Sequence, residues 1–129
     1  MATIMIADDV DMVRRFIRRI VEDLGHTPVE AENGEVAWQK FQRQPIDLFV
    51  VDVKMPEMDG VTFLHKVKEK DPHAVIIMVT GFPSADAITE TIEEEAYTYV
   101  TKPLKVDQMR DLIERGLEFR KAQLQAGGN

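Results

Sequence analysis

Five short runs of apolar and β-branched residues constrain the fold of this chain most. The first, third and fourth runs are nearly continuous, without polar residues at alternate positions. A strand with one solvated face alternates apolar and polar side chains, so a continuous run is typical of a strand covered on both faces, as in a parallel sheet. The expected strands are Thr3–Ala7, Pro28–Ala31, Ile46–Val51, Val75–Val79 and Tyr97–Val100.

Between these runs the apolar residues recur with the period of a helix. The first stripe ends before Gly25, and later helices are expected after Gly34, after Gly60, from Ser84 and around Val106. Strands that alternate with helices predict an α/β fold, with a parallel sheet and helices on both faces. The first helix also carries four arginines away from its stripe, which we interpret as a solvated face: Arg14, Arg15, Arg18 and Arg19.

Composition excludes several classes of protein. The 129 residues fit one domain, and a net charge of −7 argues against binding nucleic acid through its phosphates. The chain has no cysteine, which excludes disulfides and thiolate metal sites. We also find no apolar segment long enough to span a bilayer and no signal-peptide pattern, so a cytoplasmic protein without membrane contact is expected.

Polar residues follow the ends of four expected strands. Asp8 and Asp9 follow the first strand, Asp52 the third, Thr80 the fourth and Lys102 the fifth. The carboxyl ends of parallel strands meet at one edge of a sheet, where doubly wound folds bind their ligands. Three converging carboxylates repel one another and need a cation, and an all-oxygen set suits Mg²⁺. The sequence therefore predicts a magnesium site at this edge.

Four segments of the chain resemble the receiver domain of bacterial two-component response regulators. They are Asp8-Asp9, Val50–Gly60, Val79–Gly81 and Tyr99–Pro103, and the resemblance covers residues 3–120. It implies a five-stranded sheet in the order 2-1-3-4-5, the flavodoxin-like doubly wound (βα)5 arrangement. It also implies a signalling domain rather than an enzyme. Such a domain takes a phosphoryl group from the phosphohistidine of a sensor histidine kinase or a histidine phosphotransfer protein.

The resemblance assigns roles to the residues at the strand ends. Asp52 is the implied phosphoacceptor. Asp9 would contact Mg²⁺ directly and Asp8 mainly through water, while Asp52 and the backbone carbonyl of Lys54 would complete the protein ligands. Lys102 would pair with Asp52 and then with a phosphoryl oxygen.

A second group of residues would stabilise and transmit the phosphorylated state. Thr80 is expected to hydrogen-bond a phosphoryl oxygen, and Tyr99 is expected to turn inward when Thr80 moves. The Lys102–Pro103 peptide bond is expected to be cis, so that the lysine points into the site. Lys54 and Phe82 would flank the phosphoryl group and tune its lifetime. Neither residue carries an amide or acid that orients water.

The implied output face consists of the fourth helix, the fifth strand and the fifth helix. This face would control a downstream protein or a tethered effector domain, and it also allows a homodimer. We assign residues 1–122 to the receiver domain, and residues 123–129 to a polar tail or the start of a linker.

Two rival functions share much of this fold. A HAD-like aspartyl-phosphate phosphohydrolase needs a second aspartate two residues after its nucleophile, and that position holds Lys54. A flavodoxin-like electron carrier needs a Ser/Thr/Gly-rich phosphate loop after the first strand, where Asp8 and Asp9 would repel a flavin phosphate. Both rivals are therefore disfavoured.

Overall fold

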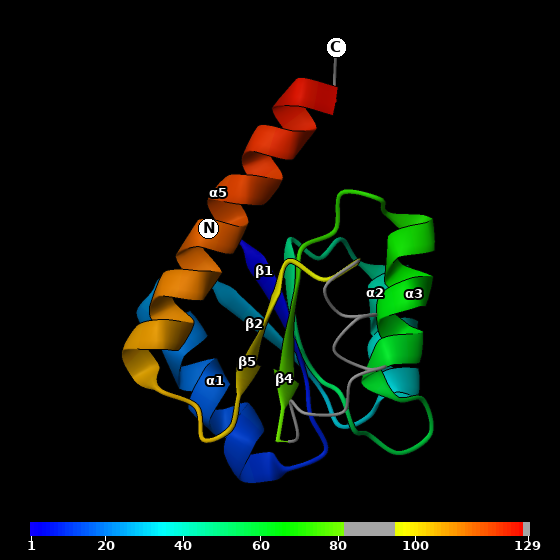
Figure 1. The fold of residues 1–129 in the computed structure, drawn as a ribbon, viewed down its shortest axis with the longest axis vertical. Coiled ribbons are helices and arrows are strands. Elements are labelled where there is room, and N and C mark those ends of the chain that lie inside the picture. The colour runs from blue at the N-terminus through cyan, green and yellow to red at the C-terminus, as the bar shows by residue number, and fades with distance from the viewer. Residues whose placement is uncertain (82–94, 128–129) are drawn as a thin grey trace.

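The computed structural model of the protein describes residues 1–81 and 95–127. Five parallel strands form one sheet in the order β2-β1-β3-β4-β5, with helices on both faces (Figure 1). The expected fold class and strand order are confirmed. The described elements are β1 (Thr3–Ala7), α1 (Asp11–Asp23), β2 (Thr27–Ala31), α2 (Gly34–Arg43), β3 (Leu48–Asp52), α3 (Gly60–Lys70), β4 (Ile76–Thr80), β5 (Thr98–Thr101) and α5 (Val106–Gly127).

The continuous apolar runs are buried because both faces of the sheet are covered. Every residue of β3 and β4 is buried. Successive side chains of a strand point to opposite faces. Phe49 and Val51 therefore pack in the core layer with residues of α2 and α3, while Leu48 and Val50 pack in the layer with residues of α1 and α5. Figure 1 shows these two pairs of helices on either side of the sheet.

Local sequence sets where the helices begin and end. Asn33 accepts a hydrogen bond from the Val36 N–H at 2.8 Å, and Asp59 accepts one from the Thr62 N–H at 2.8 Å, so each caps the first turn of its helix. Gly25 follows α1 with a φ of 85°, a left-handed conformation that glycine adopts without strain. These local contacts fix the points at which the loops between strands and helices begin and end.

Strand boundaries shift toward the carboxyl edge relative to expectation. β3 ends at Asp52 and β4 at Thr80, because Asp52 still pairs with Val79 and Thr80 with Thr101. These two polar residues are therefore the last residues of strands rather than the first residues of loops. The helix expected from Ser84 lies outside the described residues.

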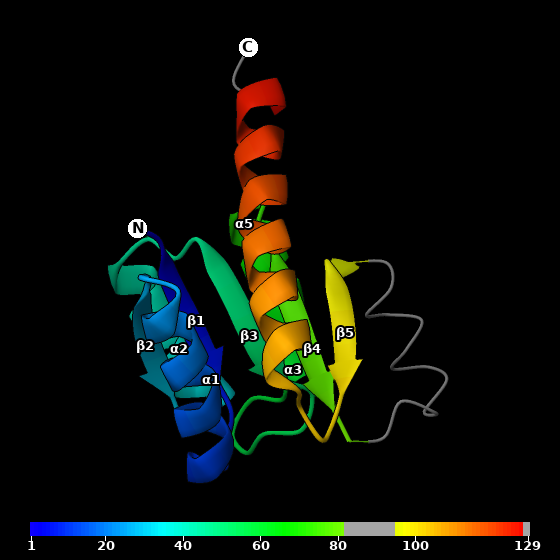
Figure 2. The same cartoon turned by 90° about the vertical axis from the view of Figure 1, so that its left-hand side faces the viewer.

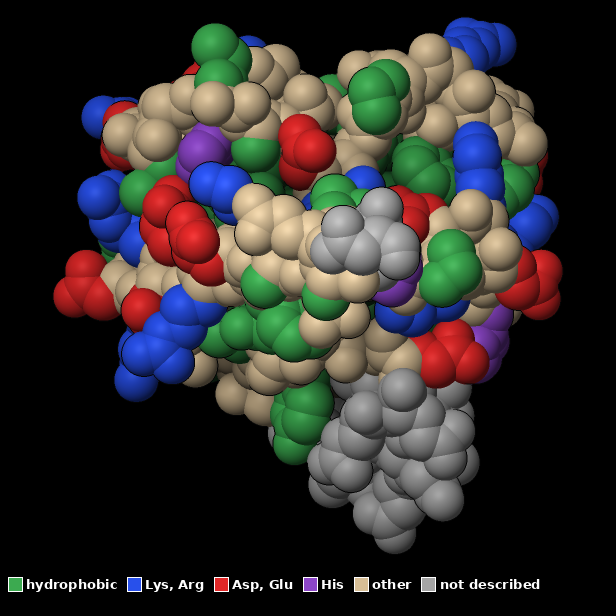
Figure 3. Space-filling view, turned by 90° about the horizontal axis from the view of Figure 1, so that it is seen from above, with side chains coloured by type: hydrophobic (Ala, Val, Ile, Leu, Met, Phe, Trp, Pro, Cys, Tyr) green, Lys and Arg blue, Asp and Glu red, His purple; other side chains and the backbone are tan. Residues whose placement is uncertain are grey.

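Helix α5 extends well past the sheet (Figures 1 and 2). It has 22 residues and includes residues 123–127, so that segment is helical. Phe119 and Leu124 on this helix are each 45% exposed. Figure 3 views the molecule from this end, where acidic and basic side chains lie interspersed. None of the helices within residues 1–81 and 95–127 has the length and apolar character needed to cross a membrane.

Candidate functional site

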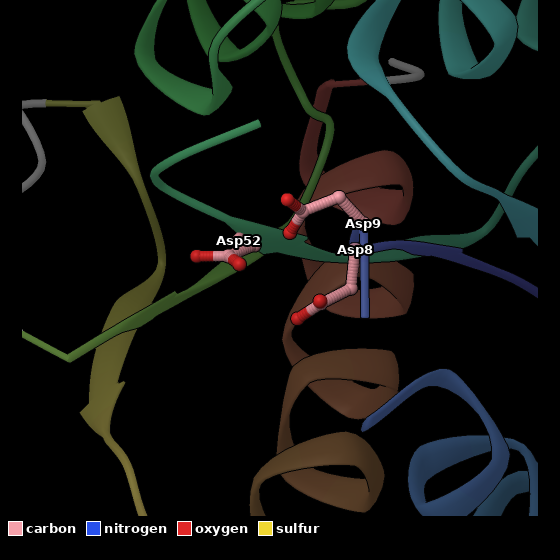
Figure 4. Close-up of side chains that lie close together, drawn as sticks. All are labelled: Asp8, Asp9 and Asp52. Carbon is pink, nitrogen blue, oxygen red and sulfur yellow. The ribbon is translucent and has the colours of Figure 1, made fainter. Parts of the chain in front are cut away.

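Three carboxylates converge at the carboxyl edge of the sheet (Figure 4). One oxygen from each of Asp8, Asp9 and Asp52 lies within 4.8 Å of the others. Asp52 ends β3, and Asp8 directly follows β1, the neighbouring strand. Asp8 and Asp52 are buried, whereas Asp9 is exposed. We call these three residues the acidic cluster, and Asp9 forms its solvent side.

Lys102 brings a positive charge to the acidic cluster. Its Nζ donates a hydrogen bond to Asp52 Oδ2 at 3.2 Å and lies 3.7 Å from Asp8 Oδ2. Burial lowers the pKa of Lys102, but the charges of Asp52, Asp8 and Asp9 and the hydrogen bond to Asp52 together outweigh burial and leave the pKa above its ordinary value. The lysine therefore stays charged at neutral pH. The peptide bond between Lys102 and Pro103 is cis.

Burial and an oxygen without a hydrogen-bond donor disfavour the charged form of Asp8. Its Oδ1 accepts a hydrogen bond from the Val10 N–H at 2.8 Å, but its buried Oδ2 has no hydrogen-bond partner among the described residues. Burial is the main cause that raises the pKa of Asp8 to about 6. The hydrogen bond from Val10 opposes this rise, and the charge of Asp52 adds to it.

The residues present fit a bound divalent cation. Three carboxylates and one ammonium leave two negative charges at the site, and Asp8 Oδ2 lacks a donor. A hard cation such as Mg²⁺ would satisfy that oxygen and offset this charge. The backbone N–H of Lys54 donates to Asp52 Oδ1 at 3.2 Å, and the Lys54 side chain is exposed. The carbonyl expected as a ligand thus belongs to a residue that directly contacts Asp52.

Asp8→Asn is expected to stabilise the metal-free protein in a pH-dependent way. Because the folded-state pKa of Asp8 is about 6 and its ordinary value is 3.8, ionisation of Asp8 costs folding free energy as the pH rises from 4 through 6. The variant should therefore gain up to about 3 kcal/mol of unfolding free energy at pH 8 and little at pH 4.

Urea denaturation with a chelator at both pH values measures this effect. Asp23→Asn, which removes an exposed carboxylate from the end of α1, is the control and should change stability by less than about 0.5 kcal/mol. An equal gain for Asp8→Asn at both pH values would contradict the assignment.

Thr80 and Tyr99 lie on the neighbouring strands β4 and β5. Thr80 is buried at the end of β4, and its carbonyl accepts a hydrogen bond from the Lys102 N–H at 2.9 Å. Tyr99 is half-buried, pairs in register with Met78, and packs against the core layer that contains α2 and α3 residues. Phe82, the other residue expected near Thr80, lies outside the described residues.

The prediction for Arg14 is wrong. Its side chain is 13% exposed rather than solvated, and its Nη1 donates a hydrogen bond to the carbonyl of Asp8 at 2.6 Å. Arg15, Arg18 and Arg19 are exposed, as expected. One signal distinguishes Arg14: it precedes the buried Val21 by seven residues, which places both on nearly the same face of α1.

Comparisons with known proteins agree with this geometry. The family model of the response regulator receiver domain matches residues 4–114. Chemotaxis protein CheY of Bacillus subtilis (strain 168) is 35% identical over 115 residues, which cover 88% of this chain and 96% of that protein. The DNA-binding transcriptional regulator NtrC of Escherichia coli (strain K12) is 27% identical over 122 residues, which cover 95% of this chain and 26% of NtrC.

A solved structure shows the same arrangement of elements. The crystal structure of a response regulator receiver domain protein from Clostridium thermocellum superposes with a TM-score of 0.87 at 25% identity, and the match covers 95% of this chain and 99% of that one. Because the family model matches most of the chain and CheY is similar over nearly its full length, this chain belongs to the receiver domain family of response regulators.

Proposed function

We propose that this domain accepts a phosphoryl group on Asp52 from the phosphohistidine of a sensor histidine kinase or a histidine phosphotransfer protein. The proposal rests on the hydrogen bonds that hold the Asp52 carboxylate. Its Oδ2 accepts a hydrogen bond from Lys102 Nζ, and its Oδ1 accepts one from the Lys54 N–H, each at 3.2 Å. Held at both oxygens at the end of a buried strand, the carboxylate has the fixed direction that a positioned nucleophile requires.

Phosphoryl transfer needs little more than position and charge at this site. An oxygen of Asp52 would attack phosphorus, and the phosphorus–nitrogen bond to the donor histidine would break with its electron pair returning to the imidazole. Lys102 and the Thr80 hydroxyl would each meet a phosphoryl oxygen. Bound Mg²⁺ would neutralise the repulsion between the carboxylate and the phosphoryl group. Its proposed ligands are Asp8, Asp9, Asp52 and the carbonyl of Lys54.

Labelling of the intact chain with acetyl phosphate in the presence of Mg²⁺ tests this proposal. We expect one phosphoryl group, stable in acid and labile in base, which borohydride reduction and peptide mass spectrometry place on Asp52. Labelling should stop when EDTA removes the metal. A phosphoryl group on another residue, or equal labelling in EDTA, would contradict the proposal.

We place the output of the domain on the face that includes β5 and α5. Thr80 would turn toward the phosphoryl group, and Tyr99 on the adjacent strand would turn inward, so phosphorylation would bias two arrangements of this face. Val106 is 47% exposed at the start of α5 and offers an apolar contact there. The partner that binds this face and responds to its change would be a downstream protein, a tethered effector domain or a second copy of the chain.

Two further features concern the form of the output and the cellular compartment. NtrC, described as a DNA-binding transcriptional regulator, matches this chain over 26% of its own length, which supports a tethered effector as one form of output. The absence of cysteine suits a reducing cytoplasm, where we place the domain.

We assign the lifetime of the phosphoryl group to Lys54 and Phe82. The acyl phosphate breaks down when water attacks in line with the bond between Asp52 and phosphorus. The exposed side chain of Lys54 has a long stem that would lie over this opening, and neither residue orients water. A long-lived phosphoryl group is therefore inferred.

A further inference from the structure

We infer that Arg14 is a positioning residue that holds Asp8 and Asp9 in the geometry required for metal binding, an inference that rests on the proposed function. Arg14 lies on the first turn of α1, and its guanidinium points back to the end of β1. Its Nη1 donates to the carbonyl oxygen of Asp8 at 2.6 Å, and its side chain is 13% exposed. A hydrogen bond from a charged donor that is largely shielded from water is stronger than one between neutral groups.

The hydrogen bond from Arg14 fixes the peptide that joins Asp8 to Asp9. β1 ends at Ala7, so the carbonyl of Asp8 lies beyond the last paired residue of the strand. The Asp8 N–H donates to the Ala31 carbonyl at 3.1 Å, and the Asp8 carboxylate accepts from the Val10 N–H. Arg14 therefore holds the remaining backbone group of Asp8. Because this peptide plane sets the direction of the Asp9 side chain, the contact orients the exposed carboxylate of the acidic cluster.

Two other carboxylates hold the guanidinium in place. Its Nη2 pairs with Asp11, and its Nε lies 3.5 Å from Glu30 Oε1 on β2. Arg14 thus links the loop after β1 to both α1 and β2. A planar guanidinium presents several donors in a fixed fork, a geometry that the compact ammonium of lysine does not reproduce.

The contacts of Arg14 indicate a geometric role rather than simple charge balance. Among the residues that the structure describes, Arg14 forms ion pairs with Asp11 and Glu30 and none with the acidic cluster. Its contact with the cluster is through the Asp8 backbone. Loss of the guanidinium should therefore disturb the direction of the carboxylates while leaving the chemistry at Asp52 intact.

The test compares Mg²⁺ binding by Arg14→Met, Arg14→Lys and Arg18→Met with that of the parent chain. Arg18 is the matched control, because it lies on the same helix and pairs with Glu30 at 2.7 Å without contacting Asp8. Amide chemical shifts are followed in Mg²⁺ titrations without phosphodonor, well below the unfolding temperature. We expect Arg14→Met to raise the Kd for Mg²⁺ about tenfold, Arg14→Lys to recover part of the affinity, and Arg18→Met to stay within about twofold.

Phosphorylation at saturating Mg²⁺ provides a second readout. Its rate in Arg14→Met should come within about threefold of the parent rate, because metal binding and not the transfer step is weakened.

An unchanged Kd for Mg²⁺ in Arg14→Met, with only a lower unfolding temperature, would overturn the inference. If Arg14→Met does not fold, an unchanged Kd in Arg14→Lys would overturn it instead. Normal labelling of Asp52 in the parent, combined with unchanged affinity in the variants, would reject this inference alone. Absent labelling with weakened affinity would reject the proposed function alone.

Discussion

Asp9→Ala is expected to slow the phosphorylation of Asp52 by about 100-fold, because it removes the solvent-side carboxylate of the proposed Mg²⁺ site. Without that ligand, the attacking carboxylate and the phosphoryl group would meet with much of their repulsion unscreened. The same change should stabilise the metal-free fold, since Asp9 adds negative charge beside Asp8 and Asp52. Phosphorylation with acetyl phosphate and thermal unfolding in EDTA measure the two effects, which should have opposite signs.

Asp107→Ala is the control for Asp9→Ala. Asp107 is an exposed carboxylate in the first turn of α5 and lies outside the acidic cluster. Its replacement should leave the rate of phosphorylation within about twofold of the parent rate, while Asp52→Asn sets the zero level. A parent-like rate for Asp9→Ala at low Mg²⁺ would show that Asp9 is not a ligand.

Gly60→Ala is expected to lower the unfolding free energy by about 3 kcal/mol. A Cβ at Gly60 would lie 2.1 Å from the carbonyl oxygen of Asp52 and 2.9 Å from the Cα of Val53. Both are backbone atoms, so no side-chain rotation relieves the overlap and α3 must move away from β3. The hydrogen bond from the Gly60 N–H to the Val53 carbonyl, 2.9 Å long, would be lost or stretched. Phosphorylation should also slow, because the shifted backbone carries Asp52 itself.

Gly81→Ala is the matched control for Gly60→Ala. A Cβ at Gly81 would meet no described atom within 4 Å. We expect its unfolding free energy in urea to stay within about 0.5 kcal/mol of the parent value. Equal stability of the two variants would show that the close approach of α3 to β3 is not required.

The fold was predictable because its strongest signals are local. Leu48–Val51 and Val75–Val79 are continuous apolar runs, and only a sheet covered on both faces buries such runs completely. Asn33, Asp59 and Gly25 mark helix ends by capping chemistry that depends on neighbouring residues alone. The exact ends of β3 and β4 were less predictable, because they depend on whether Asp52 and Thr80 still find partners on the adjacent strand.

The acidic cluster was also predictable, since parallel strands bring their carboxyl ends together. Asp8, Asp52 and Lys102 lie at such ends, and their contacts follow from the order of the strands. Arg14 was missed because its partners, the Asp8 carbonyl and Glu30 on β2, lie outside α1, although its spacing from Val21 places it toward the buried face. The raised pKa of Asp8 likewise requires the packed structure, because burial is its main cause.

The length of α5 has a mechanical consequence. The helix starts four residues after Lys102, which pairs with Asp52, and has 22 residues, so that its tip lies far beyond the sheet (Figure 2). At about 1.5 Å per residue it is a rod about 33 Å long, and a tilt of about 5° at the base would carry the tip about 3 Å. Phe119 packs against Tyr97 and Arg120 pairs with Asp71, so the helix is anchored to the domain as far as residue 120, and any tilt of the tip must either break these contacts or move the segments that make them.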